Sequence, residues 1–145
     1  MSFKNRTVAV IGAAGGVGGA LCRRLAVDGA NLVLIGRRQQ PLETIAAETG
    51  GAPLVADATL VEELEEALAG MDKLYGVVNC AGSLLLKPAH ATSMAEWDHT
   101  IASNLTTAFA AVRAAVKAFG SRGGSIVLLS SAAARIGLSN SPKNG

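Results

Sequence analysis

Glycines dominate the first segment of the chain whose composition suggests chemistry. Residues 12–20 read GAAGGVGGA and follow an apolar run at residues 7–12, TVAVIG, which is typical of a buried strand. Glycines let a backbone approach phosphate groups closely, and the N–H groups at the start of a following helix attract their negative charge. Because the strand precedes the loop and a helical pattern follows it, the segment predicts a pyrophosphate site rather than tight packing alone. The predicted contacts are Gly12, Ala14, Gly15, Gly16, Val17 and Gly18.

Two arginines stand where the second strand is expected to end. In an NAD site, an acidic residue about 20 residues past the glycine loop binds the ribose hydroxyls. The sequence has Gly36, Arg37 and Arg38 there instead. Guanidinium groups pair with phosphate, whereas a carboxylate would repel it. The arginines therefore favour NADP over NAD, with two solvated arginines on a turn as the alternative.

Apolar runs alternate with helical patterns along the whole chain. The predicted strands are residues 7–12, 31–36, 52–57, 74–79 and 124–130, and the predicted helices are 17–28, 41–50, 59–69 and 93–120. Capping boxes, in which Thr59 pairs with Glu62 and Ser93 with Glu96, are expected to open the last two helices. The alternation predicts the α/β class: one domain over residues 1–145, with a doubly wound parallel sheet of five strands and helices on both faces.

The composition excludes several classes of protein. Of 145 residues, half are hydrophobic and 17% are charged, which excludes a disordered chain. A net charge of +2, 3% aromatic residues and the lack of a long uncharged apolar run argue against a nucleic-acid partner and a membrane span. Cys22 and Cys80 lie far apart, and His90 and His99 are expected in a loop and on a solvated helix face. We therefore expect no metal site, and reduced cysteines in the cytoplasm.

Several motifs, in order along residues 6 to about 139, resemble the short-chain dehydrogenase/reductase family. IGAAGGVG resembles its glycine motif T-G-x-x-x-G-x-G, with Ile11 in place of the threonine. Asp57 in DAT resembles an acid that accepts a hydrogen bond from adenine, and NCAG resembles a signature that lies beneath the cofactor. EWDHTIASNLTTAF and GSIVLLSSAAARIG resemble segments with a catalytic Asn and Ser, here Asn104 and Ser131. The further cofactor contacts that the resemblance implies are Ala58, Asn79, Ala81 and Gly82.

The resemblance implies a Rossmann-type sheet, NADP as cofactor, and hydride transfer between its nicotinamide and a small carbonyl or alcohol substrate. It also implies a general-acid Tyr about a dozen residues after Ser131, with a Lys one helical turn later. The Tyr position falls near Asn144 and the Lys position beyond Gly145, while the only tyrosine is Tyr75. We therefore expect a chain that binds the cofactor without the proton donor. A binding-only protein and an interaction module stay open as alternatives.

The long helix at residues 94–119 is expected to join copies of the chain into a homo-oligomer. In the family that the chain resembles, this helix packs against its twin. A stripe of small and apolar side chains along the helix suits close pairing with another helix. The stripe consists of Ile101, Leu105, Ala108, Ala111, Ala115 and Phe119.

Overall fold

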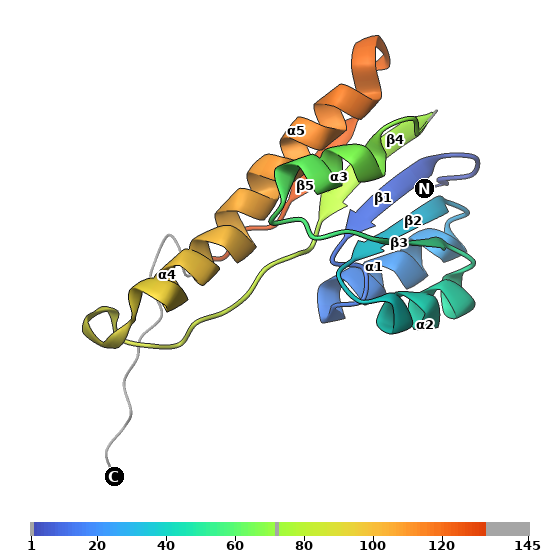
Figure 1. Cartoon of the computed structure of the whole chain (residues 1–145). Coiled ribbons are helices and arrows are strands. Elements are labelled where there is room, and N and C mark those ends of the chain that lie inside the picture. Colours follow the sequence, from blue (N-terminus) through green and yellow to red (C-terminus); the bar gives the residue numbers. More distant parts are fainter. Residues whose placement is uncertain (1, 72, 133–145) are drawn as a thin grey trace.

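Five parallel strands form one sheet within residues 2–71 and 73–132, the residues that this computed structural model describes. The strands lie in the order β3-β2-β1-β4-β5 (Figure 1). In register, Val10 of β1 lies opposite Leu34 of β2 and Val78 of β4. The predicted doubly wound α/β class is confirmed, although β3 and β5 are shorter than expected. The strands are β1 (Thr7–Ile11), β2 (Asn31–Gly36), β3 (Ala52–Val55), β4 (Leu74–Asn79) and β5 (Ser125–Leu128).

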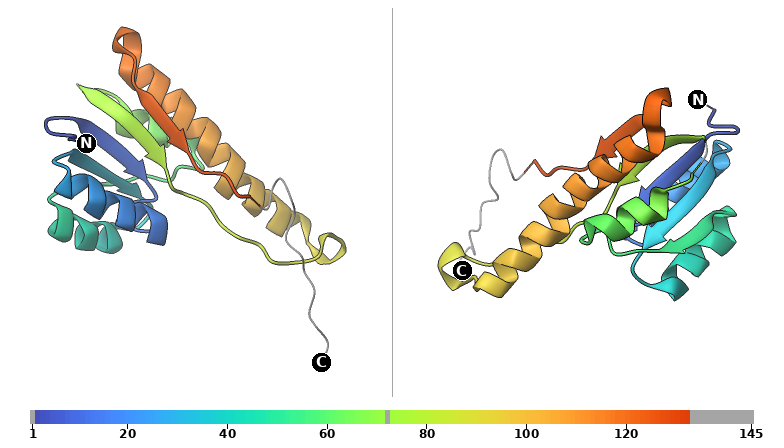
Figure 2. Two further views of the ribbon diagram at one scale, coloured as in Figure 1. Left: turned by 180° about the vertical axis from the view of Figure 1, so that it is seen from behind. Right: turned by 45° about the horizontal axis from the view of Figure 1, so that its top comes forward.

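Helices cover both faces of this sheet (Figures 1 and 2). The side chains of β1 alternate between two core layers: Val8 and Val10 pack in one layer with Leu42, while Ala9 and Ile11 pack in the other with Leu64. Because both faces are buried, the central strands are apolar throughout instead of alternating with polar residues. The helices of the first layer are α1 (Gly16–Val27) and α2 (Gln39–Thr49), and those of the second are α3 (Val61–Leu68) and α5 (Thr107–Phe119).

A π-helical segment, η2 (Ala102–Thr106), interrupts the long helix that the sequence predicts as continuous. The segment joins α4 (Met94–Ile101) to α5. The predicted capping box at the start of α4 is confirmed: the Glu96 N–H donates to Ser93 Oγ at 3.2 Å, and the Ser93 N–H donates to Glu96 Oε2 at 2.8 Å. Hydrogen bonds from Lys87 and then from Ser93 lower the pKa of Glu96 to about 2. The carboxylate that fixes the start of α4 therefore stays charged at ordinary pH.

The second predicted capping box is wrong. α3 begins at Val61, its N-cap is Leu60, and no side chain caps it. The hydroxyl and N–H of Thr59 both donate instead to Asp57 Oδ1, at 2.8 and 2.9 Å. A charged carboxylate is a strong hydrogen-bond acceptor. Thr59 therefore bonds to Asp57, two residues earlier, instead of capping the helix.

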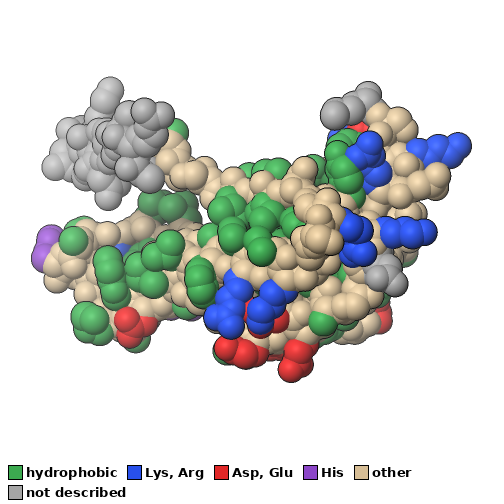
Figure 3. Space-filling view, turned by 90° about the horizontal axis from the view of Figure 1, so that it is seen from above, with side chains coloured by type: hydrophobic (Ala, Val, Ile, Leu, Met, Phe, Trp, Pro, Cys, Tyr) green, Lys and Arg blue, Asp and Glu red, His purple; other side chains and the backbone are tan. Residues whose placement is uncertain are grey.

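The stripe predicted to join two copies of the chain is also wrong in part. Ala111 and Ala115 are fully buried and Phe119 is 4% exposed, because all three pack in the chain's own core beneath α3. Another set of apolar side chains points outward from η2 and α5, one helical turn apart, and Figure 3 shows hydrophobic side chains gathered on this face. We call this set the outer stripe; it consists of Leu105, Phe109, Val112 and Val116.

Exposed apolar side chains also lie in and directly after β5, one of the two edge strands of the described sheet. Val127, Leu128 and Leu129 are each about half exposed, at 47%, 45% and 53%. An apolar edge of this kind is prone to pair with another strand unless something covers it.

None of the described helices is long and apolar enough to cross a membrane.

Candidate dinucleotide-binding site

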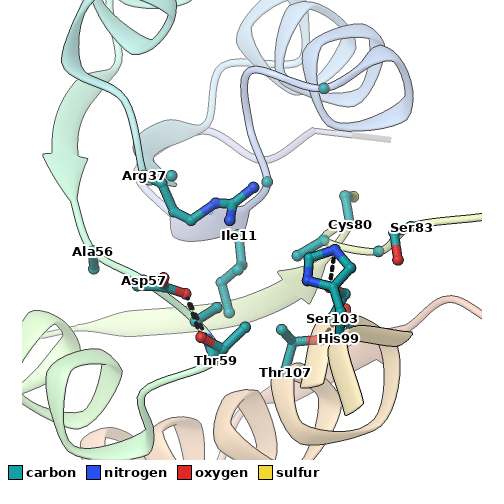
Figure 4. Close-up of a pocket in the computed structure, with 16 residues that line it drawn as sticks. Ile11, Arg37, Ala56, Asp57, Thr59, Cys80, Ser83, His99, Ser103 and Thr107 are labelled. Atoms are coloured by element: carbon teal, nitrogen blue, oxygen red, sulfur yellow. Dashed lines mark hydrogen bonds between the residues drawn. The ribbon is translucent and has the colours of Figure 1, made fainter. Parts of the chain in front are cut away.

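A pocket lies where the carboxyl ends of the parallel strands meet the wall formed by α4, η2 and α5 (Figure 4). Open α/β sheets bind ligands at this edge, because the loops there leave a crevice. Four strand ends and the helical wall contribute to the lining. The residues are Ile11, Gly12 and Gly15 at and after the end of β1; Gly36 and Arg37 at and after the end of β2; Ala56, Asp57, Ala58 and Thr59 after β3; Cys80, Ala81, Gly82 and Ser83 after β4; and His99, Ser103 and Thr107 from the wall.

The glycines of the loop after β1 serve two different purposes. A Cβ at Gly12, whose φ is +76°, would lie 2.8 Å from the Ala81 nitrogen, and a Cβ at Gly18 would lie 2.1 Å from the Gly12 oxygen. These two glycines are required by packing. A Cβ at Gly16 would meet nothing within 4 Å. The open side of the loop, where α1 begins without a side-chain cap, therefore has room for a phosphate group beside the helix N–H groups.

Arg37 and Arg38 are both predicted from the sequence to bind the cofactor, but only one of them lines the pocket. Arg37 lines the pocket and is labelled in Figure 4. Arg38 is the N-cap residue of α2, is exposed and does not line the pocket. One guanidinium group, not two, is thus available at this end of the pocket.

Asp57 presents a charged carboxylate to the pocket. Partial burial alone would raise the pKa of Asp57, but the hydrogen bonds from Thr59 and the positive charge of Arg37 outweigh that effect and lower the pKa. Both bonds from Thr59 end on Oδ1, so Oδ2 can receive a donor from a ligand. An ionised, oriented carboxylate suits recognition of an amino group.

Asn79 fixes the loop that follows β4. Its buried side chain accepts a hydrogen bond from the Ala81 N–H at 3.1 Å and donates to Thr107 Oγ1 at 3.4 Å. The Thr107 hydroxyl donates in turn to the Ser103 carbonyl at 2.9 Å. Asn79 does not line the pocket; it ties the pocket-lining Ala81 to the helical wall.

Asn104 holds the same loop from the π-helical segment. Its Oδ1 accepts from the Ser83 N–H at 3.1 Å, and its Nδ2 donates to the Thr100 carbonyl at 2.9 Å and to Ser83 Oγ at 3.3 Å. A Cβ at Gly82 would lie 3.0 Å from Oδ1, so Asn104 and Gly82 fit closely. π-helical turns are frequent at functional sites, and this one carries a side chain that braces the pocket.

The structure does not bring every predicted site residue into the pocket. Gly12, Gly15, Arg37, Asp57, Ala58, Ala81 and Gly82 line it, whereas Ala14, Gly16, Val17, Gly18, Arg38, Asn79 and Asn104 do not. Ser131 is exposed, follows the end of β5, and is also absent from the lining. The position expected for the general-acid tyrosine, near Asn144, lies outside the described residues.

Sequence reasoning missed the polar residues of the helical wall. His99, Ser103 and Thr107 recur every four residues and line the pocket together. A regular helical spacing did not identify them, because the π-helical segment changes the helical phase between His99 and Thr107. His99 is exposed, as expected, but it lies at the pocket and not on a face remote from it. Cys80 also lines the pocket; burial raises the pKa of its thiol, which therefore stays protonated.

Within residues 2–71 and 73–132, no group of three or more His, Cys, Asp or Glu side chains gathers as a metal site. Both cysteines are free thiols: Cys22 is buried, and burial raises its pKa to about 11. The charged side chains that line the pocket are Arg37 and Asp57. The site is thus suited to binding and orienting an anionic ligand.

The two kinds of glycine can be told apart by stability. We expect Gly18→Ala to destabilise the fold by about 3 kcal/mol, because its methyl group would collide with the Gly12 carbonyl. Thermal denaturation should then show a fall in Tm of about 10 °C. The matched variant Gly16→Ala, at an open helical position, should change the stability by less than about 1 kcal/mol. Equal losses of stability in both variants would contradict the assignment of Gly18, but not Gly16, to packing.

The sequence matches the family described as short chain dehydrogenase over residues 6–143. It is 34% identical to D-threitol dehydrogenase of Mycolicibacterium smegmatis over 139 residues, covering 89% of this chain and 54% of that protein. It is 39% identical to galactitol 2-dehydrogenase (L-tagatose-forming) of Cereibacter sphaeroides over 130 residues, covering 85% of this chain and 51% of that protein.

Solved structures agree with this match. A short-chain type dehydrogenase/reductase from Mycobacterium ulcerans superposes with a TM-score of 0.85 at 29% identity, covering 92% of this chain and 54% of that chain. A short-chain dehydrogenase/reductase from Brucella melitensis superposes with a TM-score of 0.87 at 34% identity, covering 96% of this chain and 62% of that chain. The chain spans about half the length of the relatives it matches. Because the family match extends over nearly the whole chain, the protein belongs to the short-chain dehydrogenase/reductase family.

Proposed function

We propose that this chain is the NADP(H)-binding portion of an oxidoreductase that transfers a hydride between nicotinamide and a carbonyl or alcohol. The observation that carries the choice of cofactor is Arg37, which lines the pocket at the end of β2, where an NAD site has an acid. A charge-assisted hydrogen bond to the 2′-phosphate contributes about 1.5–3 kcal/mol. That free energy corresponds to a preference for NADP of roughly tenfold to hundredfold.

The first test is the affinity for the two cofactors. Calorimetry should show tighter binding of NADP than of NAD, and of 2′,5′-ADP than of ADP. Arg37→Asp should reverse the preference, because the new carboxylate repels the 2′-phosphate and can bind ribose hydroxyls. The matched control is Arg38→Asp, which makes the same change of charge outside the pocket and should preserve the preference. Equal affinities for NADP and NAD in the unaltered chain would refute the choice of cofactor.

The residues of the chain bind and orient the reactants. The nicotinamide cofactor, when bound, supplies or accepts the hydride. The open side of the glycine loop would hold the pyrophosphate, and Asp57 would accept from the adenine amino group. Asn104 holds the loop after β4, and we assign Ser131 to polarising the substrate carbonyl. Relatives named for D-threitol and galactitol support an alcohol as the class of substrate.

Tyr75 cannot serve as the proton donor of this reaction. It lies near the start of β4, whereas the pocket lies beyond the carboxyl end of that strand. The Arg6 guanidinium sits 4.0 Å from its ring centroid, and Phe3 packs edge-on against it at 6.3 Å. Tyr75 thus has a structural role, and the second candidate function is a chain that binds the nucleotide without turning it over.

Turnover distinguishes the two candidates. We expect the isolated 145-residue chain to bind NADPH but to reduce carbonyl compounds at least 10²- to 10⁴-fold more slowly than an ordinary dehydrogenase, the usual cost of losing a positioned proton donor. Absorbance of NADPH measures the rate. Turnover at ordinary dehydrogenase rates that Ser131→Ala abolishes would show that another residue of this chain donates the proton.

We also propose that the chain forms a homo-oligomer through its long helix, using the outer stripe. Its apolar side chains are 36–63% exposed and recur at the four- and three-residue spacing of a helix-pairing seam. The neighbouring cations do not oppose pairing, because Arg113 and Lys117 both bind Glu65 of α3 within the chain. Burial of this stripe against a second copy would remove apolar surface that monomers rarely expose.

Sedimentation tests this interface. The unaltered chain should sediment as a dimer at micromolar concentration, and Phe109→Glu should give a folded monomer by placing a charge on the outer stripe. Ala111→Glu is the matched contrast: its carboxylate would be buried in the chain's own core, so it should unfold the protein instead. A folded monomer in the unaltered chain would refute the proposal.

A further inference from the structure

The helical wall of the pocket presents one flat ring. His99, at the pocket end of α4, lines the pocket above Ser103 and Thr107 (Figure 4). Its Nε2 lies 3.3 Å from Ser103 Oγ, within hydrogen-bonding distance. This contact restricts the rotation of an otherwise exposed side chain, so the ring has a defined position before any ligand arrives.

Small side chains line the same pocket as His99. Ala56, Ala58 and Ala81 line the pocket with single methyl groups, and Ala56 and Ala58 are nearly fully buried. Asp57, between the two buried alanines in the sequence, adds a carboxylate to the lining. Small apolar side chains in a pocket that also contains an exposed ring leave room for an aromatic heterocycle. Of the described residues that line the pocket, His99 alone carries an aromatic ring.

We infer that His99 stacks on the purine of the bound dinucleotide, with Ser103 as the residue that positions its ring. This inference rests on the proposed function, because it assigns the base of the same ligand. The phosphate groups are left to Arg37 and the start of α1, which lie on other sides of the pocket (Figure 4). Stacking depends on the face of the ring, so the role requires an aromatic side chain and not a charge.

Nuclear magnetic resonance detects such stacking directly. The chain has two histidines, and His90 lies in the short turn Ala89–Ala91, outside the pocket lining. On addition of 2′,5′-ADP, the ring current of the purine should shift the carbon-bound protons of His99 upfield. The same protons of His90 should stay in place, and spectra of His90→Gln assign the two sets of signals. Unmoved His99 signals in a protein saturated with 2′,5′-ADP would overturn the inference.

Calorimetry with the same ligand separates stacking from hydrogen bonding. His99→Ala should weaken binding of 2′,5′-ADP and NADP about tenfold, and His99→Phe should restore most of that loss because it keeps a flat ring. Ser103→Ala should cost about twofold to threefold by freeing the ring. His90→Ala is the control and should change nothing. Circular dichroism checks the fold of each variant, since His99 is exposed and its replacement leaves the core intact.

The outcomes separate this inference from the proposed function. If the unaltered chain binds neither 2′,5′-ADP nor NADP, the proposed function fails and this inference fails with it. If it binds both while His99→Ala binds equally well, the function stands and the stacking role is wrong. If His99→Phe binds as weakly as His99→Ala, the ring nitrogens rather than the ring face make the contact, which also overturns the inference.

Discussion

The close approach of two loops at the carboxyl edge of the sheet is the constraint on which the site depends. The loop after β1 meets the loop after β4 at Gly12, where any side chain would strike the Ala81 backbone. The start of α1 is set against the same loop, since Gly18 leaves no room between its backbone and the Gly12 carbonyl. This packing aims the first turn of α1 at the crevice, and the helix dipole therefore adds positive potential where a phosphate would bind.

The opposite side of the crevice is held by amide side chains. Asn79 ties Ala81 to α5 through Thr107, and Asn104 ties Ser83 to the π-helical segment. Because hydrogen bonds to the buried amide of Asn79 and the exposed amide of Asn104 hold Ala81 and Ser83 of this short loop, the pocket lining after β4 cannot shift without breaking them. Asn104 lies in the middle of a helical stretch, where asparagine is unfavourable, and its three hydrogen bonds account for its presence there.

The sequence predicted the fold and the place of the glycine loop between a strand and a helix, because local patterns decide both. Buried parallel strands are continuous apolar runs, and the Ser93 capping box needs only residues three apart. The Thr59 box failed because Asp57 competes for its hydroxyl, a contact that the capping pattern does not consider. The outer stripe was missed for a related reason: small residues such as Ala111 suit a helix pair between copies as well as a helix packed on its own sheet. The π-helical turn also changes the helical phase between Ile101 and Thr107, so a regular helical spacing carried across it does not identify one face.

Arg37 and Arg38 are neighbours in the sequence but differ in their relation to the pocket. This difference determines the charge of the pocket. Adjacent residues after a strand point in different directions, so Arg37 lines the crevice while Arg38, the N-cap residue of α2, does not. Arg37 and the start of α1 provide positive potential, and Asp57 provides an ionised hydrogen-bond acceptor. The pocket therefore complements an anion that also carries a hydrogen-bond donor. A plain phosphate would use the first of these features and leave Asp57 without a partner from the ligand. An adenine nucleotide would satisfy both, because it carries phosphate groups and an amino group on its base.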